Sequence, residues 1–198
     1  MGGPVGAVAT VGVLALQGAF AAHVDLLTEL GATARLVKTP EQLAGVDALV
    51  MPGGESTTMS KLLVSSGLFD AIDTRLRAGM PAFGTCAGMI LLAAEVLDGR
   101  PDQRSLAAID IAVRRNGYGR QVDSFETDLD VAGMDEPLRA VFIRAPGVER
   151  VGPDVEVLAR VDGAPVLCRS GPVLVAAFHP ELTDDLRVHQ QLLSVSGS

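Results

Sequence analysis

The chain has 198 residues, of which 48% are hydrophobic and 20% are charged, a composition that excludes a disordered protein. Its net charge of −8 argues against sequence-independent binding of nucleic acid, which requires clustered lysine and arginine. Two cysteines, Cys86 and Cys168, are too few for a disulfide framework and favour a reducing cytoplasm. We expect one domain over residues 1–198, with residues 1–10 as an additional N-terminal segment.

The first apolar segment raises the question of a membrane span. Residues 5–22 carry no charge and are about as long as a membrane-spanning helix. Three glycines interrupt this segment, and no basic residue precedes it, as a signal peptide would require. Residues 11–16 are better explained as a buried strand that ends at Gln17. We therefore predict no membrane association.

Short apolar runs then alternate with amphipathic stretches. The pattern predicts strands at residues 11–16, 33–37, 47–51 and 80–83, and helices at residues 19–30, 57–65, 69–78 and 89–97. Gly31 fits the C-terminal cap of the first helix, and Thr39-Pro40 marks the start of another. Alternation of this kind predicts a parallel sheet covered by helices on both faces.

The second half is richer in short β-like runs, at residues 110–113, 140–143, 155–161, 165–169 and 173–178. Asp162-Gly163 and Ser170-Gly171 are hairpin-turn dipeptides, so the last three runs should pair antiparallel. A helix over residues 184–193 closes the pattern, whereas residues 98–105 are irregular. The predicted fold is α/β: a mostly parallel open sheet flanked by helices on both faces, with an antiparallel extension.

The segment Phe83-Gly84-Thr85-Cys86-Ala87-Gly88 places a cysteine between two glycines, after an apolar run and before a helical one. This is the layout of a nucleophile elbow, in which a strand turns sharply into a helix and holds a reactive side chain at the tip. A thiol at a helix N-terminus ionises more readily, and the thiolate is the nucleophile. The alternative is a buried structural cysteine, and this segment alone leaves both interpretations open.

His179-Pro180-Glu181 follows the last predicted strand. If both side chains leave the end of that strand, His179 can act as the base for Cys86 while Glu181 orients the imidazole. The alternative is a solvated histidine beside a strand-ending proline.

The two other histidines lie within predicted helices. His23 and His189 have no carboxylate partner nearby in the sequence, and we interpret both as structural. The histidines and cysteines show no metal-ligand spacing, so no metal site is predicted.

A second polar cluster, residues 52–58, follows a predicted parallel strand and includes Gly54, Glu55 and Ser56. It therefore falls at the carboxyl edge of the sheet, where ligands bind in open α/β folds. The N–H group of Gly54, together with that of Ala87, can stabilise an oxyanion. A phosphate loop is disfavoured, because no Gly-Lys-Ser/Thr follows and Glu55 would repel phosphate. Ser56 has a further interpretation as the N-cap of the next helix.

With these clusters in order, the chain resembles the class I glutamine amidotransferases, whose glutaminase domains use a Cys-His-Glu triad. Within that class it resembles the glutaminase subunits of pyridoxal 5′-phosphate synthases. The motifs that carry the resemblance extend over nearly the whole chain, at residues 13–18, 52–58, 83–88, 115–116, 119–121, 142–146 and 178–185.

The resemblance implies a role for each matching residue. Cys86 is the nucleophile, His179 the acid and base, and Glu181 the partner that orients it. The residues implied to bind glutamine are Gly54, Glu55, Ser56, Arg115, Ile143 and Arg144. An arginine is the planar partner that the carboxylate of an amino acid needs. Gln17 follows the first strand, close to the expected oxyanion hole.

The resemblance also implies a reaction and a partner. L-Glutamine is hydrolysed to L-glutamate and ammonia through a cysteine thioester. The ammonia passes to a (β/α)8-barrel synthase subunit in a hetero-oligomeric complex. That subunit makes pyridoxal 5′-phosphate from ribose 5-phosphate or its isomer and glyceraldehyde 3-phosphate. Because pyridoxal phosphate is the product of the complex, this chain needs no cofactor.

Two alternatives are weighed against this interpretation. One is a peptidase- or deglycase-like hydrolase of the cysteine-elbow α/β superfamily, which the late His179 and Glu181 disfavour. The other is a catalytically silent subunit that binds a partner, which the intact Cys86 disfavours.

Overall fold

A central sheet organises the computed structural model, which describes residues 9–117 and 124–196. Among these residues the sheet has seven strands in the order β10-β11-β12-β4-β3-β1-β2. The strands are β1 Thr10–Leu14, β2 Thr33–Val37, β3 Ala48–Met51, β4 Ala82–Thr85, β10 Glu156–Val161, β11 Ala164–Ser170 and β12 Val173–Ala176. The run from β2 to β12 is parallel, whereas β10 and β11 pair antiparallel at the edge. The antiparallel pairing predicted for the last three runs is confirmed.

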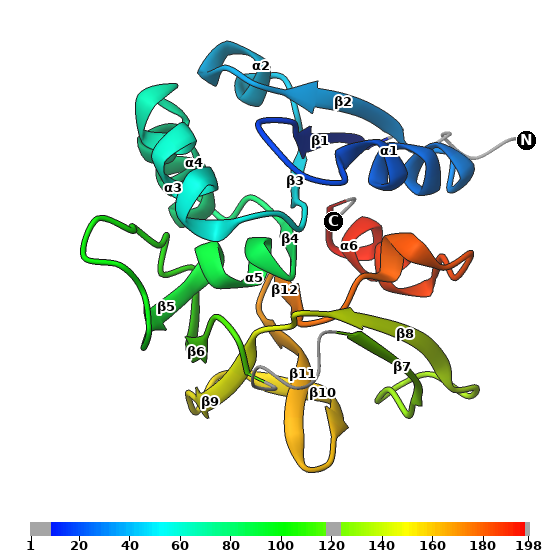
Figure 1. Ribbon diagram of the computed structural model, residues 1–198. Helices are drawn as coiled ribbons and strands as arrows, with labels where there is room; N and C mark the ends of the chain where they lie inside the picture. Colours follow the sequence, from blue (N-terminus) through cyan, green and yellow to red (C-terminus); the bar gives the residue numbers. More distant parts are fainter. Residues whose placement is uncertain (1–8, 118–123, 197–198) are drawn as a thin grey trace, which may run out of the picture.

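Helices cover both faces of this sheet. They are α1 Phe20–Glu29, α2 Pro40–Ala44, α3 Ser56–Ser65, α4 Leu68–Arg77, α5 Ala87–Leu92 and α6 Arg187–Ser196, with a 3-10 turn η1 Pro180–Leu182. In Figure 1, α1 and α6 lie on one side of the sheet, and α3, α4 and α5 lie on the other. The predicted caps are present: Thr39 Oγ1 accepts a hydrogen bond from the Gln42 N–H, and Gly31 has a φ of 79°.

Two smaller sheets complete the fold of the described residues. One consists of β5 Ala93–Val96, β6 Ile109–Arg114 and β9 Gly147–Val151, and the other of β7 Ser124–Leu129 and β8 Leu138–Ile143. The predicted helix over residues 89–97 is therefore wrong in its second half, because α5 ends at Leu92 and the chain continues as β5. All of α5 is buried, so its apolar run shows no period that could reveal where the helix stops.

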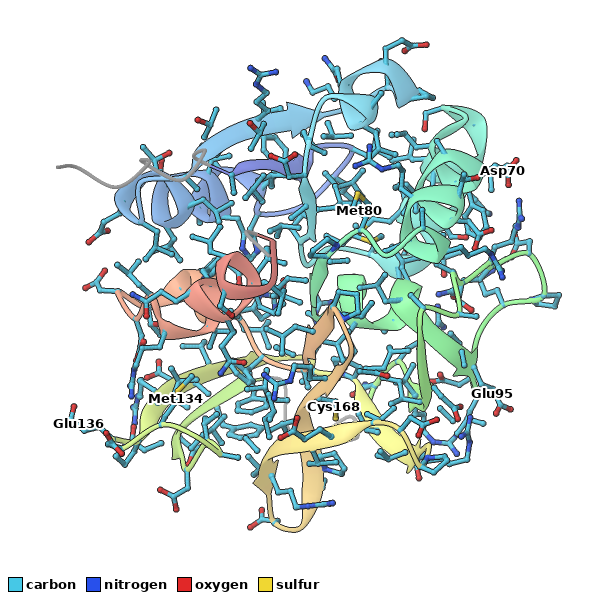
Figure 2. All side chains as sticks on the ribbon, turned by 180° about the vertical axis from the view of Figure 1, so that it is seen from behind. Asp70, Met80, Glu95, Met134, Glu136 and Cys168 are labelled. Carbon is cyan, nitrogen blue, oxygen red and sulfur yellow. The ribbon has the colours of Figure 1, made fainter. Side chains whose placement is uncertain are left out.

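The core lies along the central strands. β3, β4 and β12 are buried along their whole length, as expected for parallel strands that are covered on both faces. Met80 lies inside the molecule, whereas the carboxylates of Asp70 and Glu95 point away from it (Figure 2). Cys168 on β11 is a fully buried free thiol, and burial raises its pKa to about 11.

The strand order determines where the functional residues meet. β12, β4, β3 and β1 are neighbours and parallel, so their carboxyl ends lie along one edge of the sheet. The segments that follow these ends carry Gln17, Gly53, Cys86 and His179. Within residues 9–117 and 124–196, none of the helices has the length and apolar character needed to cross a membrane.

Candidate active site

Cys86 occupies a strained turn between β4 and α5. Its backbone has φ 51° and ψ −105°, a conformation that residues with a side chain rarely adopt. A Cβ added to Gly84 would lie 2.6 Å from the carbonyl carbon of Gly88, and one added to Gly88 would overlap the carbonyl oxygen of Met51. Both glycines are therefore required by the close approach of β3, β4 and α5, as the elbow pattern predicts.

The imidazole of His179 is held between Glu181 and Gly53. His179 Nδ1 lies 2.7 Å from Glu181 Oε1, and the His179 N–H donates to the Val141 carbonyl at 2.8 Å. A Cβ added to Gly53 would lie 2.6 Å from His179 Cε1 and 3.5 Å from Cys86 Cβ. The ring therefore lies beside the cysteine, with Nδ1 taken by the carboxylate and Nε2 left for the sulfur.

The surroundings of His179 and Glu181 shift the pKa values of both side chains. Burial lowers the pKa of His179, but hydrogen bonds with Cys86 and Glu181 and the charges of both groups outweigh it and raise the pKa to about 10. Burial raises the pKa of Glu181, but its hydrogen bond with His179 and the charge of that imidazolium lower it overall. The pair is therefore an imidazolium and a carboxylate at neutral pH.

This ion pair makes stability depend on pH in the alkaline range. His179 titrates near 6.5 in the unfolded chain and near 10 in the folded one, so the folded state holds more protons between these values. Its stabilising contribution is full below pH 6.5 and is lost as the pH rises towards 10. We expect the free energy of unfolding, measured with urea, to fall more steeply over this range in the parent than in His179→Gln. If the free energy of unfolding depended on pH equally in the two proteins, His179 could not be the group whose pKa is raised on folding.

The residues predicted to bind glutamine line one cavity of about 510 Å³ beside Cys86. All six of them line it: Gly54, Glu55, Ser56, Arg115, Ile143 and Arg144. Its other lining residues are Gly18, Ala19, Gly53, Cys86, Ile90, Asn116 and His179. A cavity of this size, lined by two guanidinium groups and one carboxylate, matches a small zwitterionic ligand.

Glu55, and not Ser56, caps α3. The Glu55 carboxylate accepts hydrogen bonds from the Thr57 N–H at 3.0 Å and from the Thr58 N–H at 2.8 Å. Burial opposes ionisation, but the hydrogen bonds from Thr58 and Thr57 together outweigh it and lower the pKa of Glu55 to about 2. Gln17 Oε1 accepts the Glu55 N–H at 3.1 Å. Gln17 and the Glu55 cap together hold the loop that carries Gly54, one of the two predicted oxyanion donors. The other predicted donor, Ala87, is the first residue of α5 and directly follows Cys86.

Arg115 reaches the cavity through contacts that the sequence did not reveal. Its Nη1 donates to Thr57 Oγ1 at 2.9 Å, and its backbone N–H donates to Asp98 Oδ1 at 2.7 Å. Gln103 Nε2 donates to Ser56 Oγ at 3.2 Å. The irregular segment 98–105 thus supports two of the predicted glutamine-binding residues. Arg115 Nε is buried and has no hydrogen-bond partner in the described part of the chain.

Ile143 and Arg144 form the exposed rim of the cavity. Arg144 has a φ of 43°, and the chain then passes Gly147, where an added Cβ would lie only 2.8 Å from the Cα of Gly117. This close backbone contact brings the segment that follows Arg115 beside the segment that follows Arg144. The motif at residues 119–121 lies outside the described residues.

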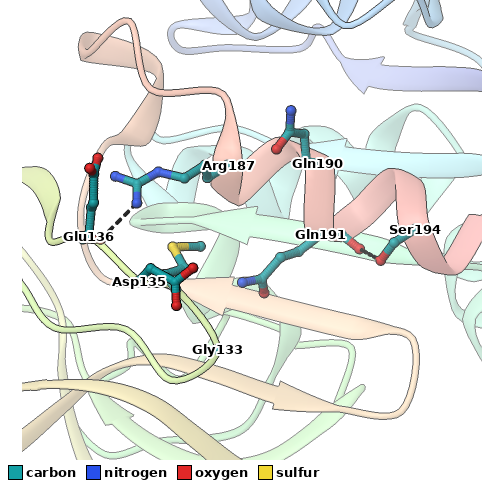
Figure 3. A pocket seen from close by; sticks show the side chains of 8 residues that line it. Gly133, Asp135, Glu136, Arg187, Gln190, Gln191 and Ser194 are labelled. Atoms are coloured by element: carbon teal, nitrogen blue, oxygen red, sulfur yellow. Dashed lines mark hydrogen bonds between the residues drawn. The ribbon is translucent and has the colours of Figure 1, made fainter.

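A separate hollow of about 620 Å³ lies between α6 and the turn that precedes β8 (Figure 3). Arg187 is its cation, but this guanidinium is already bound to the Asp185 carboxylate and to the carbonyl oxygens of Glu136 and Pro137. The described residues that line the hollow include no cysteine or histidine. Among the described residues, moreover, no group of histidine, cysteine, aspartate and glutamate side chains could hold a metal ion.

The fold and the site together define a class. An elbow cysteine follows β4, a His-Glu pair follows the neighbouring strand β12, and both lie beside an amino-acid-sized cavity. This is the arrangement of a class I glutamine amidotransferase.

The chain belongs to the SNO glutamine amidotransferase family, whose sequence model matches residues 13–196. It is 62% identical over 180 residues to the pyridoxal 5′-phosphate synthase subunit PdxT of Mycobacteroides abscessus, covering 91% of this chain and 93% of the relative. The subunit of the same name from Nocardia farcinica is 58% identical over 192 residues, covering 94% and 85%. A glutamine amidotransferase crystal structure with 49% identity superimposes with a TM-score of 0.90, covering 95% of this chain and 99% of that one. The predicted family and fold class are confirmed.

Proposed function

We propose that this chain hydrolyses L-glutamine to L-glutamate and ammonia, as the glutaminase subunit of a pyridoxal 5′-phosphate synthase. The observation that carries the proposal is the contact of His179 with both Cys86 and Glu181 at the wall of a cavity of about 510 Å³. The names of the relatives support the synthase assignment.

Substrate binding follows from the charges around the cavity. The guanidinium groups of Arg115 and Arg144 are the partners for the α-carboxylate of glutamine. The Glu55 carboxylate remains ionised because its pKa is about 2, and its charge attracts the α-ammonium group even though its oxygens cap α3. Glutamine held in this way directs its side-chain amide towards Cys86.

The chemical step uses the triad. The Cys86 sulfur, with the cationic His179 beside it, attacks the amide carbon, and the N–H groups of Gly54 and Ala87 stabilise the oxyanion. The imidazolium then protonates the leaving nitrogen, and ammonia departs from a glutamyl thioester. Neutral His179 next takes a proton from water, which attacks the thioester and releases glutamate. Glu181 stabilises the cationic form of the imidazole in both steps.

The ammonia needs a partner that receives it directly, because free ammonia in neutral water becomes ammonium, which is not a nucleophile. The proposed partner is the (β/α)8-barrel synthase subunit, in a hetero-oligomeric complex. Two exposed apolar side chains lie beside the active site and suit such a contact. Ile143 lies at the cavity rim, and Leu182, which is 50% exposed, follows Glu181 in the chain.

A test of the function is a glutaminase assay with the purified chain, alone and with the synthase subunit, that measures glutamate and the pyridoxal phosphate formed. We expect glutamate release in the complex and pyridoxal phosphate formation supported by glutamine. Cleavage of peptides or sugar adducts with glutamine left untouched would favour the peptidase- or deglycase-like alternative. Binding without any turnover would favour a silent subunit.

Gly53 provides a sharper test of the geometry. Gly53→Ala introduces a Cβ 2.6 Å from the His179 ring, so the ring must move away from Cys86. We expect kcat for glutamine hydrolysis to fall by roughly a hundredfold, since small misplacements of catalytic groups have effects of that size. Gly45→Ala is the matched control, because its new Cβ would meet nothing closer than 3.7 Å. Equal turnover in the two variants would contradict the placement of His179.

A further inference from the structure

Two fully buried histidines extend the triad into the interior. His23 comes from α1 and His189 from α6, which lie on the same side of the sheet (Figure 1), and both are 0% exposed. His23 Nδ1 lies 2.9 Å from His189 Nε2. The other ring nitrogen of His23, Nε2, lies 3.5 Å from Glu181 Oε2. Both histidines were expected to be structural, and the carboxylate partner that the sequence did not reveal is Glu181.

The two carboxylate oxygens of Glu181 differ in their hydrogen bonding. Oε1 binds His179, whereas Oε2 is buried and has no hydrogen-bond partner within standard distance in the described part of the chain. A buried carboxylate oxygen without a donor costs free energy, because it has lost the hydrogen bonds that water would supply. His23 Nε2 is the group that faces this oxygen. Its distance of 3.5 Å is that of an electrostatic contact, one that a small movement would shorten to a hydrogen bond.

The hydrogen-bond geometry selects one arrangement of protons. Burial lowers the pKa of both histidines, that of His189 to about 3, so each ring is neutral and carries one N–H. If His189 Nε2–H donates to His23 Nδ1, the His23 proton is on Nε2 and points at Glu181. The unpartnered His189 Nδ1 is then a lone pair. The opposite arrangement is less favourable for two reasons. It turns a lone pair of His23 towards the negative carboxylate, and it leaves a buried N–H of His189 without an acceptor.

The surroundings hold this pair in place. The Phe83 ring packs edge-on against both imidazoles, with centroid distances of 6.4 Å to His23 and 5.4 Å to His189. Thr85 Oγ1 lies 3.4 Å from His23 Nε2, on the strand that leads into the elbow. The histidine pair is therefore fixed by the same strand that positions Cys86.

We propose that His23, oriented by His189, is a positioning residue for the reaction: it fixes the free oxygen of Glu181 and so keeps the carboxylate aimed at His179. The proposal rests on the proposed glutaminase function for its role in turnover. The alignment of His179 with Cys86, by contrast, does not depend on that function and is expected in the protein without substrate as well.

The test compares His23→Leu, which fills the space without an N–H, with His23→Gln, whose amide nitrogen replaces the Nε2 donor. We expect kcat for glutamine to fall roughly tenfold in His23→Leu with KM nearly unchanged, and to recover largely in His23→Gln. Without substrate, the rate of Cys86 alkylation by iodoacetamide should follow the same order. In a Glu181→Ala background, His23→Leu should cause no further loss, because His23 acts through that carboxylate.

Thermal unfolding separates a positioning role from packing. If His23→Leu does not fold, His189→Leu is measured in its place and should lower kcat in the same direction. Three results would overturn the proposal. The first is full turnover and a full alkylation rate in a folded His23→Leu, the second is an equal loss in His23→Leu and His23→Gln, and the third is unfolding of both His23→Leu and His189→Leu. A parent that leaves glutamine untouched but still shows the alkylation order would instead contradict the proposed function alone.

Discussion

Cys86→Ser should lower glutamate release by roughly a thousandfold or more, because loss of a nucleophile removes the covalent route. The serine side chain fits the same turn, and its hydroxyl is a far weaker nucleophile than a cysteine sulfur beside the cationic His179. The measurement is kcat for glutamine hydrolysis in the presence of the synthase subunit. Circular dichroism should show that the variant is folded.

Cys168 is the matched control for this substitution. It is the other thiol of the chain, fully buried on β11, and burial raises its pKa to about 11 so that it stays a neutral thiol. We expect Cys168→Ala to keep turnover within about twofold of the parent, since surface and core positions away from the site act on stability instead. Normal turnover in Cys86→Ser, or equal losses in both variants, is the outcome that disagrees with a cysteine nucleophile.

Gly88→Ala should destabilise the fold by about 3 kcal/mol or more, at or beyond the upper end of typical overpacking effects. The added Cβ overlaps the carbonyl oxygen of Met51, which is backbone and cannot rotate aside as a side chain could. α5 must therefore move away from β3, and the elbow that holds Cys86 moves with it. Urea unfolding gives the loss of stability, and the glutaminase assay gives the loss of turnover.

The control is again Gly45→Ala, whose Cβ makes ordinary contacts and whose backbone has φ −95°, so alanine adopts it without strain. It should change the free energy of unfolding by less than about 1 kcal/mol. If Gly88→Ala were as stable and active as this control, α5 and β3 could not be packed as closely as the structure places them.

Much of the fold was predictable because the signals are local. Buried parallel strands such as β3 are continuous apolar runs, and Thr39 and Gly31 cap their helices through bonds or dihedral angles that their residue types favour. The failures occur where the pattern carries no local period. The α5–β5 junction is apolar throughout its helical part. β7 was missed because polar Thr127 stands between Phe125 and Leu129 on its inward face and interrupts the alternation of apolar and polar residues.

The candidate site was predictable because its residues follow strands that lie side by side. Cys86 and His179 are far apart in sequence, but β4 and β12 are hydrogen-bonded neighbours and parallel, so both residues leave the same edge. Their catalytic roles and the glutamine contacts stay predictions. Asp98 and Gln103 were missed because an irregular segment has no pattern that shows which groups it approaches.

The interior histidines were missed for a different reason. His23 and His189 were interpreted as structural, and both are buried. The partner of His23 is a carboxylate brought close by the packing of α1 against the turn after β12. A contact between helices and a distant turn depends on tertiary packing, and sequence spacing alone does not encode it. The same packing turns an apparently structural pair into a candidate support for Glu181.

The most direct test of the central claim is to find the covalent intermediate. The complex of this chain with the synthase subunit is mixed with glutamine, quenched in acid within one turnover, digested and analysed by mass spectrometry. We predict a glutamyl group on the peptide that contains Cys86, absent from the peptide that contains Cys168 and absent in Cys86→Ser. Glutamate release without a glutamyl adduct on Cys86, or with the adduct on another residue, would contradict the account.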